Sequence, residues 1–213
     1  MRIEAEPPKD CPLCPRLVEY RWENQRKEPS WFNGPAPSFG DPNARLLVLG
    51  LAPGRGGANR TGRPFTGDFA GVLLYETLIK FGFATGKYQA RPDDGVQLVD
   101  CMLSNAVRCA PPGNKPLPVE EATCRSFLTA RIMALPKLKA IVTLGDVSRR
   151  NVLKALSLSG SAAPSGHGVI YQAGPYRLFN SYHCSRLNTN TGRLTTPMFE
   201  AVFRDVRDYL DQA

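Results

Sequence analysis

The sequence predicts an α/β fold, a three-layer α/β/α sandwich around a central, mainly parallel β-sheet. Short apolar segments typical of buried strands alternate with segments whose apolar residues recur at helical spacing. Such alternation favours helices packed on both faces of a parallel sheet. Three loops of unusual composition each follow a predicted strand. At 213 residues, the chain fits one domain spanning 1–213.

The first half of the chain supplies two of the predicted strands. Residues 45–52 (RLLVLGLA) form a continuous apolar run, as expected of a buried parallel strand. A glycine-rich loop, 53–68, follows, and an amphipathic helix is expected over about 69–81. A second strand candidate, 96–107, leads into a loop, 110–118, that holds four prolines.

The second half repeats the alternation. A helix is expected over 119–134, a strand over 139–145 and a helix over 147–155. Another strand is expected over 176–183, and a closing helix over 197–210. Ligands of parallel sheets bind at the carboxyl ends of the strands. We therefore expect the three unusual loops to meet there.

Composition limits the class of protein. The chain is 42% hydrophobic and 22% charged, and it carries a net charge of +8, which suits a protein that holds phosphates but does not by itself establish one. No apolar run reaches the roughly 18–20 residues of a membrane helix, and residues 1–10 do not resemble a signal peptide. We expect a cytoplasmic monomer with no membrane partner and no organic cofactor.

Four of the six cysteines are candidates for a shared metal site: Cys11, Cys14, Cys109 and Cys124. The first two form C-x2-C, and the other two flank the proline-rich loop. Four thiolates can hold a [4Fe–4S] cluster or a structural zinc, but buried cysteines that bind nothing would give the same pattern. Cys101 and Cys184 are expected to pack as small apolar residues.

Four sequence segments carry a resemblance to a known family. They are CPLCPRL (11–17), GLAPGRGGANRTGRPFTGD (50–68), AVRCAPPGNKP (106–116) and SYHCSRLNTNTGRLT (181–195). Together they closely resemble the type-b, or fifth-family, uracil-DNA glycosylases, and the likeness covers about 11–210. The resemblance implies an α/β/α fold, a [4Fe–4S] cluster and excision of uracil from double-stranded DNA. It also implies tolerance of other deaminated bases, including hypoxanthine and xanthine.

With this resemblance, the four cysteines become the expected ligands of a [4Fe–4S] cluster. The cluster would be structural, tying the N-terminal segment to the proline-rich loop and holding that loop against DNA.

Three residues are the catalytic candidates. A glycosylase flips its target base into a pocket, stabilises the departing base as an anion, and passes through a cationic sugar. His183 would donate to the base oxygen, although an isolated histidine is more often a core residue. Asp68 would orient water or stabilise the sugar, although its place before a helix also suits an N-cap. Asn114 would read the base edge, although G-N alone suggests a turn.

Other residues are expected to shape the pocket. Phe65 would stack on the flipped base or, alternatively, belong to the core. Many uracil glycosylases carry an acidic residue just after the first strand, where this chain has Leu51 and Ala52. The residues expected to contact the base are Phe65, Ala52, Gly54, Asn105, Asn114 and Asn188.

A further group is expected to contact DNA. Leu187 would fill the gap left by the flipped base, with Arg186 beside it. Lys115, Arg108 and Arg193 are candidates for phosphate contacts, but charge alone does not separate them from other surface residues.

A different class of function fits part of the same pattern. The chain could be a non-catalytic nucleic-acid-binding module, or an electron-transfer protein, built on an iron–sulfur cluster; zinc is a further alternative. The absence of an ionisable group at 51–52 favours a protein without catalytic activity. The set of polar residues in converging loops favours an enzyme.

Overall fold

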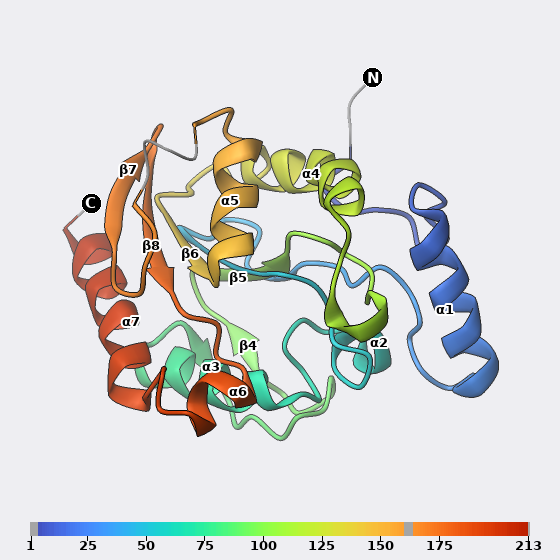
Figure 1. The fold of residues 1–213 in the computed structure, drawn as a ribbon. Helices are drawn as coiled ribbons and strands as arrows, with labels where there is room; N and C mark the ends of the chain where they lie inside the picture. The colour runs from blue at the N-terminus through green and yellow to red at the C-terminus, as the bar shows by residue number, and fades with distance from the viewer. Residues whose placement is uncertain (1–3, 160–163, 213) are drawn as a thin grey trace.

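A six-stranded sheet forms the middle layer of the molecule, between helices on its two faces (Figure 1). Its strand order is β1-β5-β2-β6-β8-β7. The computed structural model describes residues 4–159 and 164–212. The four central strands run parallel to one another: β2 (Leu46–Gly50), β5 (Cys101–Asn105), β6 (Ala140–Leu144) and β8 (Tyr176–Ser181). The two edge strands, β1 (Phe39–Gly40) and β7 (Ile170–Ala173), are antiparallel to their neighbours.

Helices cover both faces of the sheet, as the sequence predicts. On one face, α3 (Phe69–Lys80) and α7 (Thr196–Asp211) pack over one buried cluster of apolar side chains. On the other face, α4 (Pro118–Met133) and α5 (Asp146–Ala155) pack over a second cluster. Alternate residues of β2 point into the two clusters, which explains why this strand is apolar along its whole length.

Shorter elements complete the described part of the chain. They are α1 (Pro15–Lys27), α2 (Ala58–Thr61), β3 (Ala84–Thr85), β4 (Gln97–Leu98), the 3-10 turn η1 (Pro112–Asn114) and α6 (Arg186–Asn190). Helix α1 lies at the side of the sandwich, apart from the sheet (Figure 1). Within residues 4–159 and 164–212, every helix is too short or too polar to span a lipid bilayer.

The prediction of one continuous strand over 96–107 is wrong. This segment is divided into β4 and β5, and Asp100 between them has a positive φ of 52°. The Asp100 carboxylate accepts hydrogen bonds from the Arg45 backbone N at 2.8 Å and from Arg45 Nε at 2.7 Å. The break therefore connects this segment to the start of β2. The expected strand over 176–183 also ends early, at Ser181, which leaves His183 in a loop.

Candidate active site and cysteine cluster

Loops from the carboxyl ends of β2, β5 and β8 surround one pocket of about 330 Å³. This volume lies within the usual range for small-molecule sites. The pocket is lined by Leu51, Ala52, Pro53, Gly54, Phe65, Asp68, Phe69, Ala70, Asn105, Asn114, His183, Ser185 and Arg186. The expected convergence of the three loops is therefore confirmed.

His183 enters the pocket two residues beyond β8. Burial lowers the pKa of its imidazole, so the ring is neutral at pH 7. Asn188 Nδ2 donates to the His183 carbonyl oxygen at 2.8 Å and fixes the backbone at this point. Among the described residues, the His183 ring has no hydrogen-bond partner, so both ring nitrogens remain available to a ligand.

Asp68 is both the N-cap of α3 and a pocket residue. Its Oδ1 accepts a hydrogen bond from the Gly71 backbone N at 3.2 Å. Oδ2 faces the turn of the first loop, where a Cβ added to Gly54 would lie 3.5 Å from it and one added to Gly57 would overlap it. Burial raises the pKa of Asp68. Of the described residues, it is the only carboxylate that lines the pocket.

Phe65 and Asn105 come together over the end of β2. A Cβ added to Gly50 would lie 2.5 Å from Phe65 Cζ and 2.7 Å from Asn105 Oδ1. Gly50 therefore lets an aromatic ring tip and a side-chain amide approach the strand closely. Both residues are buried, at 6% and 2% exposure, so they form part of the pocket's inner wall.

Asn114 is exposed and reaches the same pocket from the proline-rich loop, at the end of η1. Its positive φ of 57° and that of Gly113, 62°, confirm a turn at this position. Ala52 and Gly54 line the pocket from the first loop, together with Leu51. No ionisable side chain occupies the positions just after β2.

The residues expected to contact DNA are spread over a wider surface. Leu187 is 73% exposed on α6. Arg186 lines the pocket, with its guanidinium 5.2 Å from the Phe69 ring centre. Arg193 lies over Tyr182, at 4.5 Å, and lines an adjoining cavity rather than the pocket.

Two expectations need correction, and a third residue lies apart from the pocket. Arg108 is not a surface residue: its side chain is 1% exposed and pairs with Glu6 at 2.9 Å. Asn188 does not line the pocket, because it lies in the adjoining cavity and its amide binds the His183 carbonyl. Lys115 is exposed and lies outside the pocket lining.

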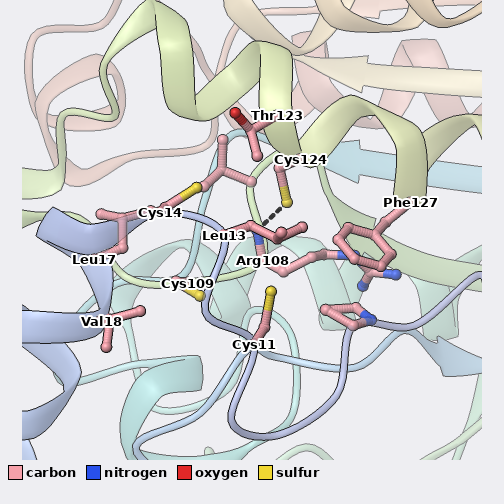
Figure 2. A pocket seen from close by; sticks show the side chains of 12 residues that line it. Cys11, Leu13, Cys14, Leu17, Val18, Arg108, Cys109, Thr123, Cys124 and Phe127 are labelled. Atoms are coloured by element: carbon pink, nitrogen blue, oxygen red, sulfur yellow. Dashed lines mark hydrogen bonds between the residues drawn. The ribbon is translucent and has the colours of Figure 1, made fainter.

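The four cysteines assigned to one site face a common space between α1, the start of α4 and the proline-rich loop (Figure 2). Apolar residues surround them, including Leu17, Val107 and Phe127. The Arg108 backbone N donates to Cys124 Sγ at 3.3 Å. Cys101 and Cys184 lie elsewhere, fully buried in the core, as expected of small apolar residues.

Burial raises the pKa of Cys109 to about 12 and that of Cys124 to about 11, and it also raises the pKa of Cys14. In residues 4–159 and 164–212, no three cysteine, histidine, aspartate or glutamate side chains are placed as the ligands of a metal ion. Four cysteine side chains facing one another in an apolar space nevertheless form a donor set that suits a soft metal or cluster.

Sequence reasoning missed two polar or aromatic pocket residues, Phe69 and Ser185. Phe69 was expected only as the first residue of a helix, but it is 39% exposed. An aromatic residue directly after the Asp68 cap was the available signal. Ser185 is also the N-cap of α6 and accepts from the Asn188 backbone N at 3.4 Å.

Comparison with protein families gives the class of protein that this fold and pocket define. The model of the Uracil DNA glycosylase superfamily matches residues 37–207. This range includes the complete sheet and all three pocket loops. The chain belongs to this superfamily.

Comparison with individual proteins gives the branch. The chain is 45% identical over 204 residues to a Type-5 uracil-DNA glycosylase of Thermus thermophilus, with 92% of each chain covered. It is 41% identical to the Type-5 enzyme of Pyrobaculum aerophilum, with 92% of this chain and 87% of the relative covered. A Type-4 enzyme of Thermotoga maritima is 36% identical over 68% of this chain. The expected resemblance to the fifth family is therefore confirmed.

Proposed function

We propose that this protein excises uracil from DNA by hydrolysing the bond between the base and C1′ of its deoxyribose. The observation that carries this proposal is the convergence, in one pocket, of a neutral imidazole without a hydrogen-bond partner among the described residues, a carboxylate, an aromatic ring and two amides. A module that only binds nucleic acid requires no such set. The product is free uracil and an abasic site.

The pocket receives a single flipped base. A base cannot be reached inside the stacked duplex, so the nucleotide rotates out of it. The Phe65 ring stacks on the base, and the amides of Asn105 and Asn114 offer donors and acceptors to its edge. Ala52 and Gly54 carry little or no side chain and leave room for it.

His183 stabilises the departing base. As the glycosidic bond breaks, its electron pair moves to the base, and negative charge grows on the base oxygens. A neutral imidazole N–H, aimed at one of these oxygens in a site with little water, stabilises the charge without giving up its proton. The lowered pKa of His183 favours the neutral ring.

Asp68 acts on the sugar side of the bond. Its carboxylate stabilises the positive charge on the ring and orients a water molecule toward C1′. The water oxygen bonds to C1′, and the released proton passes to the carboxylate. The uracil anion takes up a proton from solvent as it leaves, and Asp68 returns its proton to solvent. Because burial raises the pKa of Asp68, its carboxylate accepts this proton more readily than an exposed aspartate would.

The substrate is double-stranded DNA. Leu187, exposed beside the pocket, enters the stack as the nucleotide leaves it. Arg186 lies at the rim, and Lys115 and Arg193 contact phosphates further out. The net charge of +8 favours this partner. The protein acts as a monomer. The bases that it excises are uracil, hypoxanthine and xanthine.

A [4Fe–4S] cluster is held by Cys11, Cys14, Cys109 and Cys124. When bound, it supplies a structural link rather than reaction chemistry. The thiols fit this group because they face one another from two distant parts of the chain in an apolar space. The N-terminal segment and the start of α4 are thereby joined to the loop that carries Asn114.

The test uses end-labelled duplexes that carry one U·G pair, treated with hot alkali after incubation. Cleavage at the uracil that requires alkali and is lost in His183→Ala supports the proposal. Duplexes that carry hypoxanthine or xanthine show which other deaminated bases the protein excises. Protein that binds all three duplexes and cleaves none would instead be a non-catalytic binding module.

A further inference from the structure

Phe65 has a backbone conformation that aromatic residues rarely adopt. Its φ is +53°, in the left-handed region that favours glycine. A residue of this kind stays in place only when its surroundings fix it, and such residues are frequent at functional sites. The contacts around Phe65 therefore bear on how its ring is presented to the pocket.

Two tyrosines hold the backbone on either side of the Phe65 nitrogen. Tyr88 Oη donates to the Phe65 carbonyl oxygen at 3.0 Å, and Tyr75 Oη donates to the Pro64 carbonyl oxygen at 2.9 Å. The two tyrosine rings stack with their centres 4.5 Å apart and their planes 13° apart. Burial raises the pKa of Tyr88 to about 12, so its hydroxyl remains a donor.

Gly71 leaves the space that this arrangement requires. A Cβ at Gly71 would overlap both the Phe65 carbonyl oxygen and the Tyr88 hydroxyl. The first turn of α3 is thus in direct contact with the same hydrogen bond.

A buried ion pair anchors the segment that carries Tyr88. Arg63 and Asp94 pair at 2.8 Å with side chains 6% and 0% exposed. Arg63 Nε also donates to Thr66 Oγ1 at 2.7 Å. Asp94 accepts from the backbone N atoms of Gln89 at 3.0 Å and Val96 at 3.1 Å. The loop before α3 and the segment 88–96 therefore form one hydrogen-bonded unit.

We propose that Tyr88, anchored by the Arg63–Asp94 pair, is a positioning residue that holds the Phe65 ring in the orientation required to stack on the flipped base. This inference rests on the proposed function. It adds a role for a segment, 84–98, none of whose residues lines the pocket.

The main test is Tyr88→Phe, which removes the hydroxyl and keeps the stacked ring. We expect single-turnover excision from a U·G duplex to slow about 3- to 10-fold, the rate equivalent of one lost hydrogen bond. Affinity for a duplex that already contains an abasic site should not change, because that duplex presents no base to Phe65. Tyr209→Phe is the matched control, since the Tyr209 hydroxyl has no hydrogen bond among the described residues.

Combining Tyr88→Phe with Phe65→Leu distinguishes a role in positioning the Phe65 ring from a role in the stability of the fold. If Tyr88 acts through the Phe65 ring, Tyr88→Phe should have little further effect there. An equal loss in both backgrounds would overturn the proposal, as would a lower melting temperature with an unchanged excision rate. If Tyr88→Phe does not fold, Tyr75→Phe replaces it, with the same expected results.

The experiment also distinguishes the two proposals. Wild-type protein that releases no base from uracil, hypoxanthine or xanthine duplexes would overturn the proposed function and this inference with it. Active wild-type protein with an equally active Tyr88→Phe variant would overturn the inference alone.

Discussion

At the scale of single residues, the proposed mechanism depends on the protonation state of His183. The neutral ring is favoured because its imidazole is buried beside a pocket and lacks a charged partner among the described residues. A neutral donor stabilises an anionic leaving group throughout the reaction, whereas an imidazolium in this site would first require a costly charging step.

The pH dependence of excision follows from this state. The pKa of His183 is lowered from its ordinary value of 6.5, so we expect the single-turnover rate to stay level through pH 7 and 6.5. It should fall only at lower pH, where the His183 ring takes up a proton and the Asp68 carboxylate, whose pKa is raised by burial, is also protonated. Rates measured from pH 5 to 8 check this, and a rate that already declines between pH 8 and 7 would contradict it.

Asp68 allows its two roles to be separated by substitution. Asparagine caps helices about as well as aspartate, so Asp68→Asn should change the melting temperature by only a few degrees. Because the amide cannot accept a proton from water, we expect excision to slow by about 100-fold or more. Asp68→Ser, a second good cap, is the matched control for capping. Full turnover in Asp68→Asn would assign Asp68 to the cap alone.

At the scale of elements, α6 carries the exposed Leu187 that the proposed mechanism inserts into the DNA stack. Its N-cap Ser185 and the bond from Asn188 to the His183 carbonyl place this short helix directly after the catalytic loop. In the proposed mechanism, base flipping by Leu187 and catalysis by His183 therefore belong to one continuous segment.

We expect Leu187→Ala to reduce excision from a duplex about 10-fold and from a single strand hardly at all. The inserted Leu187 side chain offsets the free energy of unstacking the target base, which is a few kcal/mol in a duplex and much less in a single strand. Excision rates on the two forms of one oligonucleotide test this. The similarly exposed Met133 on α4, as Met133→Ala, is a matched control. Equal losses on the two substrates would argue against the wedge.

The sequence predicted the central elements well because their patterns are local. Strands β2 and β6 are apolar along their whole length because apolar clusters cover both of their faces. Helix α3 shows apolar periodicity because only one of its faces packs on the sheet. Helix α1 was not predicted. Only three of its side chains, Leu17, Arg21 and Asn24, are buried, so it has no apolar stripe to detect.

At the scale of the whole molecule, the site depends on contacts between distant segments. Convergence of the loops follows from strand order and was predictable. The burial of Arg108 was not, because its partner Glu6 lies in the N-terminal segment and nothing local marks it. The buried ion pair of Arg63 and Asp94 was not predictable for the same reason, because the two residues are distant in the sequence. Long-range pairing of this kind leaves no periodic pattern in a sequence.

The cysteine cluster should control how firmly the N-terminal segment is attached. We expect Cys14→Ser to eliminate bound iron and acid-labile sulfide and to lower the melting temperature by about 5 °C or more, equivalent to roughly 2 kcal/mol. Cys101→Ala, in the core, is the control: it should lower stability but keep the iron. Anaerobically purified wild-type protein without iron would contradict the cluster.

The most direct test of the central claim is to identify both products by mass spectrometry. A duplex with one uracil is incubated with wild-type protein, with His183→Ala and with Tyr209→Phe. We predict free uracil and an intact strand lacking that base, in equal amounts, from the wild-type protein and Tyr209→Phe, and at least about 100-fold more slowly from His183→Ala. Equal rates from all three proteins, or a strand broken without release of free uracil, would contradict hydrolysis of the glycosidic bond in this pocket.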